Sequence, residues 1–140
     1  MIPSGVHELL ANDGALVAMG ISGLRIIERE STDVRPFANG YFVVVSFEES
    51  DHRASVRRGP RVMTLWVHTP WDRSRDYRPI DRILSRIDQL FSGVEHYTGS
   101  DGVRITGIRK AGASGNLRDP AWKTICRNAA YQVLYDESAV

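Results

Sequence analysis

The side chains in this sequence that most often perform chemistry are histidine and cysteine, and their positions do not form a recognisable site. His7, His52, His68 and His96 include no two at the spacing of a metal-binding pair. Cys126 is the one cysteine, so no thiolate cluster is available to complete a zinc site. We therefore expect no metal and no other cofactor. The alternative is a metal site that only the folded chain assembles.

Two carboxylates, Asp81 and Asp88, lie seven positions apart and could serve as an acid and a base. They alternate with Arg82 and Arg86 on the polar side of a predicted helix. This alternation favours a solvated network of charges over a catalytic pair.

A glycine-rich stretch, IRKAGAS, lies among Gly107, Gly112 and Gly115 and could suggest a phosphate-binding loop. Such a loop needs its lysine followed by serine or threonine at the start of a helix, whereas here Asn116 and Arg118 come next. We interpret the stretch as a flexible connection.

Without a nucleophile–base pair, metal spacing or a phosphate loop, the sequence predicts a protein that is not an enzyme. The alternative is a small enzyme whose composite site combines His68 and Asp72 with an arginine.

An arginine cluster occupies the segment from Glu48 to Gly59, EESDHRASVRRG, which has no apolar periodicity. We expect a long hairpin loop here, and loops of this length usually bind a partner. Arg53, Arg57 and Arg58 are its candidate contact residues. No aromatic residues alternate with them and no recognition helix follows, so direct contact with nucleic acid is not favoured. A small nucleic-acid-binding module that uses this loop is an alternative.

A second irregular loop is predicted from Lys110 to Pro120, KAGASGNLRDP. Tryptophans at the junctions of loops are good interface anchors, and two of the three in this chain take such positions. The remaining candidate interface residues are Trp71, Asn116, Arg118, Asp119 and Trp122.

One amphipathic helix is the central element of the fold that we expect to position these residues. Its apolar positions recur at helical spacing and form one stripe. They are Ile80, Ile83, Leu84, Ile87, Leu90 and Phe91. Asp76 and Pro79 suit its first turn and Gly93 suits its end, so we expect the helix to run from about residue 78 to 92.

Strands precede and follow this helix. Val62–His68 is rich in β-branched and aromatic residues, and Tyr41–Phe47 is apolar on both faces, which is typical of a covered strand. Before these strands we predict an opening helical segment (2–20) with caps at Ser4 and Asp13, and a half-buried strand (24–30). After the helix we predict a hairpin (94–98 and 103–108) and a closing strand (122–135). The closing strand has a bulge or close packing at Ala129 and Ala130. The sequence predicts an α+β fold: a mainly antiparallel sheet with an amphipathic helix (about 78–92) and an N-terminal helix packed on it.

The length of the chain and the distribution of its charges limit the class of protein that these elements can form. The 140 residues suit one domain spanning residues 1–140, and the longest apolar run, Tyr41–Val45, is too short to span a membrane. Residues 1–50 carry three arginines and seven acids, a net charge of −4, whereas residues 51–127 carry fifteen cations and eight acids, a net charge of +7. Segregated charge of this kind favours protein surfaces that pair with one another.

In this order of elements the chain resembles the tail terminator proteins of long-tailed (siphovirus-like) bacteriophages. The stretches that carry the resemblance are VMTLWVHTPWDRS leading into RPIDRILSRIDQLF, then VRITGIRKAG, then NLRDPAWK before a last strand that ends in YQVLY. The similarity covers almost the whole chain and is one of arrangement, because the family has no invariant catalytic signature.

The resemblance implies a structural virion protein without an active site. Six copies would form a ring that caps the tail tube, stops its polymerisation and joins it to the head–tail connector. The implied partners are the chain itself, the tail tube protein and the head–tail connector protein, with no membrane. The implied location is the head-proximal end of the virion tail, after assembly in the host cytoplasm. Another head–tail joining protein, a connector or stopper, is the alternative.

Overall fold

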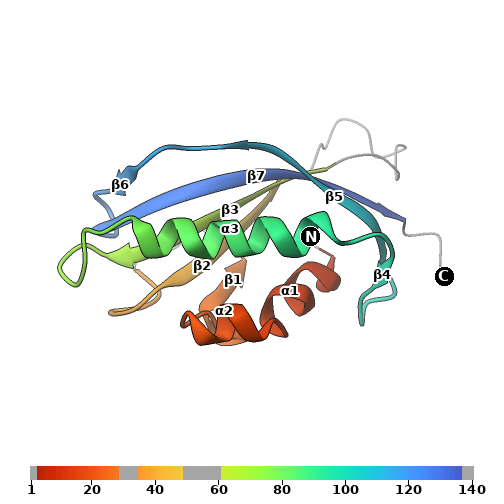
Figure 1. Cartoon of the computed structure of the whole chain (residues 1–140), viewed down its shortest axis with the longest axis horizontal. Coiled ribbons are helices and arrows are strands. Elements are labelled where there is room, and N and C mark those ends of the chain that lie inside the picture. The colour runs from red at the N-terminus through yellow and green to blue at the C-terminus, as the bar shows by residue number, and fades with distance from the viewer. Residues whose placement is uncertain (1–2, 29–34, 49–60, 137–140) are drawn as a thin grey trace.

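The computed structural model describes residues 3–28, 35–48 and 61–136. In chain order its elements are α1 (Ser4–Ala11), α2 (Gly14–Ala18), η1 (Gly23–Arg25), β1 (Ile26–Glu28), β2 (Phe42–Glu48), β3 (Arg61–Pro70), α3 (Arg78–Ser92), β4 (Tyr97–Thr98), β5 (Arg104–Ala113), β6 (Leu117–Asp119) and β7 (Thr124–Asp136). The described strands form one sheet that curves over α3, and α1 and α2 lie on the same side of it as α3 (Figure 1). The predicted α+β class is confirmed.

The sheet is mainly antiparallel and has the strand order β1-β2-β3-β7-β5-β4, with β6 also pairing β7. β1 pairs β2 in parallel, and this is the exception among the described pairs. The long strand β7 holds the two halves of the sheet together, because it pairs β3 along one side and both β5 and β6 along the other.

The core lies between α3 and the sheet. The stripe predicted for the helix is buried as expected, at Ile80, Ile83, Leu84, Ile87 and Phe91. It packs on the odd-numbered face of β3 and β7, whose buried residues include Met63, Leu65, Val67, Ala129, Tyr131 and Val133. The ring of Phe91 meets that of Tyr131 edge-on at 5.0 Å between centroids, an arrangement that aromatic pairs prefer.

The helix ends agree in part with the sequence. α3 begins at Arg78 and ends at Ser92, with Pro79 in its first turn and Gly93 just after it. The Asp76 carboxylate accepts a hydrogen bond from the Arg78 backbone N–H at 3.0 Å, one position outside the usual cap.

At the N-terminus the prediction for Asp13 is confirmed, because its carboxylate accepts from Leu16 N–H at the start of α2. The cap predicted at Ser4 is wrong. Pro3 precedes α1, and the Ser4 hydroxyl instead accepts from Asp101 N–H of the β4–β5 hairpin. α1 can approach that hairpin closely because Gly99 has no side chain; a Cβ there would lie 2.5 Å from the Ser4 Oγ.

Two strand predictions need correction. The loop predicted over 110–120 is wrong: β5 continues to Ala113 and β6 spans Leu117–Asp119, both paired with β7. The strand predicted over 24–30 is reduced to Ile26–Glu28 after a 3-10 turn, and Leu24 is 85% exposed. Of the bulge or close packing predicted at Ala129 and Ala130, the packing is present, because Ala129 is buried in the core. The bulge opposite Ala130 lies on β5, where the pairing shifts between Lys110 and Gly112. The loop predicted over 48–59 falls outside the described residues except for Glu48, which ends β2.

Candidate interaction surface at one end of the sheet

Five of the eight candidate interface residues come together at one end of the sheet, where β3 ends and β7 begins. Here β6 pairs the first residues of β7, with Leu117 opposite Cys126 and Asp119 opposite Thr124. Trp71, Asn116, Leu117, Arg118 and Trp122 are the residues that we call the tip surface. Leu117 was not among the candidates predicted from the sequence.

The turn that presents Trp122 is built by Asp119. The Asp119 carboxylate accepts hydrogen bonds from the backbone N–H groups of Ala121 at 3.0 Å and Trp122 at 3.1 Å. Aspartate favours turns for this reason. Lys123 then takes a left-handed backbone conformation with φ of 55° and returns the chain into β7.

Two further contacts fix the tip surface to its neighbours. The Trp71 backbone N–H donates to the Lys123 carbonyl at 3.0 Å, which joins the turn after β3 to the turn before β7. The Tyr77 hydroxyl donates to the Leu117 carbonyl at 2.7 Å, which ties β6 to the residue preceding α3. Three segments distant in sequence therefore support one surface.

Exposure within the tip surface is mixed. Asn116 and Arg118 are exposed, Leu117 is 37% exposed, and Trp71 and Trp122 are half-buried. Trp71 packs against the core on the helix side of the sheet, whereas Trp122 packs against His68 on the other face. Tryptophan and arginine are the residue types that protein interfaces favour. The tip surface thus has the residue types of a protein-binding surface.

Beneath Trp122 the face of the sheet without helices carries an aromatic cluster that sequence reasoning missed. The His68 ring stacks on Phe42 with centroids 5.1 Å apart and meets the Trp122 ring at 5.2 Å. His68 is buried, and its Nδ1 lies 2.8 Å from the Thr124 hydroxyl. The sequence did show that His68 and Trp66 are two positions apart in one predicted strand, which puts them on the same face of the sheet.

This cluster bears on the composite enzyme site considered from the sequence. His68 packs between aromatic rings, whereas Asp72 is exposed in the turn after β3. Cys126 lies opposite His68 in the β3–β7 pairing, and burial, with the charge of Asp119, raises the pKa of its thiol to about 11. The thiol is therefore protonated and a poor nucleophile at neutral pH.

Arg53, Arg57 and Arg58 lie outside the described residues. The strands that flank them are described, and Glu48 and Arg61 lie at the end of β2 and β3 opposite to Trp71. With β3 ten residues long, these two ends of the sheet are about 30 Å apart. The structure thus places the arginine segment's attachment points and the tip surface at opposite ends of the sheet.

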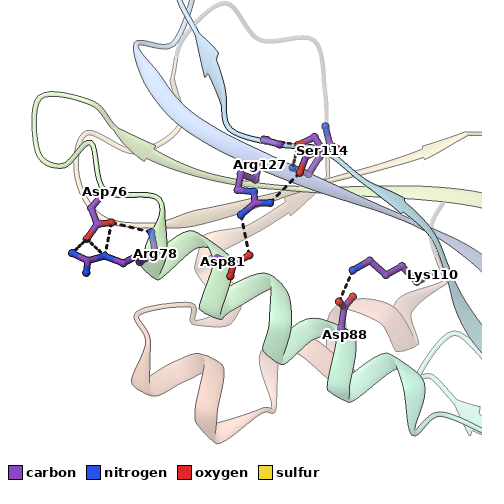
Figure 2. A network of polar contacts seen from close by, with 9 residues as sticks. Asp76, Arg78, Asp81, Asp88, Lys110, Ser114 and Arg127 are labelled. Atoms are coloured by element: carbon purple, nitrogen blue, oxygen red, sulfur yellow. Dashed lines mark hydrogen bonds and ion pairs between the residues drawn. The ribbon is translucent and has the colours of Figure 1, made fainter.

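The two aspartates of α3 are partly exposed to solvent, as predicted from the sequence, but they pair with residues of the sheet and not with Arg82 and Arg86. Asp81 binds Arg127 of β7 at 2.9 Å, and Asp88 binds Lys110 of β5 at 2.7 Å (Figure 2). The hydroxyl of the buried Tyr131 also donates to Asp88, and burial together with this contact raises the pKa of Tyr131. These acids hold the helix to the sheet.

Two further ion pairs of α3 do not involve the sheet. Arg86 of α3 forms a two-point ion pair with Asp13 at the start of α2, at 2.7 and 2.9 Å. The Arg86 guanidinium, through these hydrogen bonds, holds the pKa of the Asp13 carboxyl below its usual range. Arg78 pairs with Asp76 at the exposed start of α3 (Figure 2).

In the part of the chain that the structure describes, no group of three His, Cys, Asp or Glu side chains is placed to hold a metal ion. Among the same residues no helix is long and apolar enough to cross a membrane.

No protein-family model matches the chain, and no curated protein is similar to it in sequence. A solved structure does share its fold: a chain of the structure described as "Virion of native gene transfer agent (GTA) particle". The two align with a TM-score of 0.62 over 94% of this chain and 91% of that chain, at 14% identity. At such identity the likeness shows the fold alone, which extends over nearly the whole length of both chains.

Proposed function

We propose that this protein is a structural component of a phage-like virion and acts as a tail terminator. Six copies form a ring on the last layer of the tail tube, stop its polymerisation and join it to the head–tail connector. The protein then resides at the head-proximal end of the tail after assembly in the host cytoplasm.

The observation that carries this proposal is the fold likeness to a chain of a gene transfer agent virion, which extends over 94% of this chain. The sequence resemblance to tail terminators supports the same class of protein independently of that structure. The two lines of support both favour a structural role in a virion.

The distribution of candidate contact residues suits a joining protein. A protein that links a tube to a connector needs two contact surfaces that face in different directions. The tip surface lies at one end of the sheet, and the chain segment with Arg53, Arg57 and Arg58 is attached at the other. We assign one of these two ends to the tube and the other to the connector.

The test is to produce particles without this protein and to image their tails. Loss of a terminator gives tails of uncontrolled length that do not join heads. Loss of a connector or stopper protein instead gives tails of normal length that remain unjoined. Particles with tails of normal length that are joined to heads would overturn both the terminator and the connector interpretation.

Variants then locate the contacts. Reversing Arg53, Arg57 and Arg58 together to glutamate should leave the monomer folded but release control of tail length, because rim charges tune association while the fold is maintained elsewhere. Arg82→Glu, on the exposed side of α3, is the control and should give normal tails. If the triple reversal gives normal tails, the tip surface becomes the next contact to test, by Arg118→Glu with Trp122→Ala.

A further inference from the structure

The two outer edges of the sheet are unlike, and both are open in the described part of the chain. On one edge, β5 pairs β7 along its length, but its outer side is covered only at Arg104 and Ile105, by the two residues of β4. From Gly107 to Ala113 no described strand lies beyond it, as the outermost position of β5 in Figure 1 shows. This stretch is the β5 edge.

Backbone groups on an open strand edge form a ready template for pairing with another chain. On the β5 edge, the residues from Arg109 to Ala113 are exposed. They include the cations Arg109 and Lys110. The edge therefore combines free backbone with positive charge.

The opposite edge of the sheet is β1, Ile26–Glu28, which pairs only β2 among the described strands. Beside it lies a largely apolar groove of about 80 Å³ between α1 and the strand. Its lining includes Val6, His7, Ile27 and Glu28. Glu28 is exposed and brings a negative charge to this β1 edge.

Exposed charges of opposite sign lie on these two edges. On the β1 edge, Glu28 is the exposed residue of the strand. On the β5 edge, Arg109 is exposed, and Lys110 is exposed and paired with Asp88 of α3. The order of strands puts β1 and β5 on opposite sides of β3 and β7, so these charges lie at opposite edges of the sheet.

We propose that copies of this chain join side by side, with the β5 edge of one copy against the β1 edge of the next. The contact is heterologous, because the two surfaces are different, and such contacts repeat into a ring or a filament according to the rotation between copies. Glu28 on one edge and Arg109 on the other favour this contact over β5 against β5 or β1 against β1. The occupant of each open edge is thus a second copy of this protein.

The closure of this contact into a ring of six rests on the proposed function, whereas the contact itself does not. The contact adds to the proposed function, because the β5 edge and the β1 edge would bind the neighbouring copies in the ring. The two ends of the sheet would then bind the tube and the connector.

Cysteine cross-linking of the full-length protein tests the contact directly. Glu28→Cys and Arg109→Cys each add one exposed thiol, and a flexible linker with two maleimides can join them without a fixed register. The native Cys126 is buried, and burial raises its thiol pKa to about 11, so the wild type supplies the unreactive background.

We expect the two single variants, mixed, to give covalent dimers at least about tenfold faster than Glu28→Cys mixed with Arg82→Cys, because a real contact raises the effective concentration of the thiols. The double variant should be linked beyond the dimer. Dimers from Arg109→Cys alone at a similar rate would show a symmetric contact and overturn the proposal. A mixture no faster than the control pair, at the highest soluble concentration, would also overturn it.

Charge reversal provides a second measurement that needs no cross-linker. Arg109→Glu should weaken self-association in sedimentation, and Glu28→Arg in the same chain should restore it. Failure of the second change to restore association, with both variants folded, contradicts the pairing of these edges. Because these experiments use the free protein, they distinguish failure of the edge contact from failure of tail capping, which tail length reports.

Discussion

Removing the Asp88 carboxylate should loosen the junction of α3 with β5 and β7 by a definite amount. Asp88 accepts hydrogen bonds from the Tyr131 hydroxyl and from the Lys110 ammonium. Tyr131 is 1% exposed, so in Asp88→Ala its hydroxyl loses a partner inside the protein. A buried donor left without an acceptor costs about 1–3 kcal/mol.

A groove next to this junction limits the cost. It has a volume of about 310 Å³ and is lined by Asp88, Phe91, Ile108, Lys110 and Tyr131 among others. Water entering the groove can bind the Tyr131 hydroxyl, so we take about 1.5 kcal/mol for its loss. The Lys110 and Asp88 side chains are 49% and 32% exposed, so their ion pair adds only about 0.5 kcal/mol. The expected total is about 2 kcal/mol.

Urea unfolding of Asp88→Ala, Tyr131→Phe, Lys110→Ala and the two double variants measures these terms separately. The coupling free energy of Asp88 with Tyr131 should exceed that with Lys110 by about threefold, given the values above. Asp72→Ala, at an exposed aspartate, is the control and should change the unfolding free energy by less than about 0.5 kcal/mol. A larger coupling with Lys110 than with Tyr131 would refute the reasoning.

Three further changes test other parts of the fold. Ile87→Asp puts an unpaired carboxylate at a fully buried position and should cost about 4 kcal/mol or more; thermal unfolding like the wild type would contradict the packing of α3. Lys123→Gly should raise the unfolding free energy by about 0.5 kcal/mol, because glycine relieves the left-handed backbone at φ of 55°, and Lys123→Ala, measured in urea beside it, should not. Because Arg86 lowers the folded-state pKa of Asp13, the pair stabilises the protein above pH about 4 and loses this effect as the pH falls through the lowered pKa. The stability difference between the wild type and Asp13→Asn, measured by urea unfolding, should therefore be smaller at pH 3 than at pH 7.

The elements that the sequence predicted well are those whose signals are local. The stripe of α3 repeats within a single helix, and its start at Arg78 and end at Ser92 follow from Pro79 and Gly93 within a few residues. The Asp13 cap likewise depends on a hydrogen bond to Leu16 only three residues away. Sequence patterns report such contacts because both partners lie in the same short window.

The predictions that failed depend on distant partners. The residues from Lys110 to Ala113 are exposed on β5 and show no alternation, so only pairing with β7 makes them a strand. The tip surface was predicted residue by residue, but its assembly depends on the contact of Trp71 with Lys123, which lies far along the chain. No local pattern could show that these residues meet. The contact of His68 with Trp122 could not be predicted for the same reason.

The position of β7 in the chain has a consequence for synthesis. This strand holds the two halves of the sheet together, yet it is translated after every element that it joins. While the ribosome is still making β5, the residues of β2, β3 and α3 have been synthesised, but the strand that lies between β3 and β5 has not. Contacts that must await distant segments slow folding, and unpaired strands exposed in the meantime favour aggregation. The yield of this protein in the cell should therefore depend on how fast β7 follows.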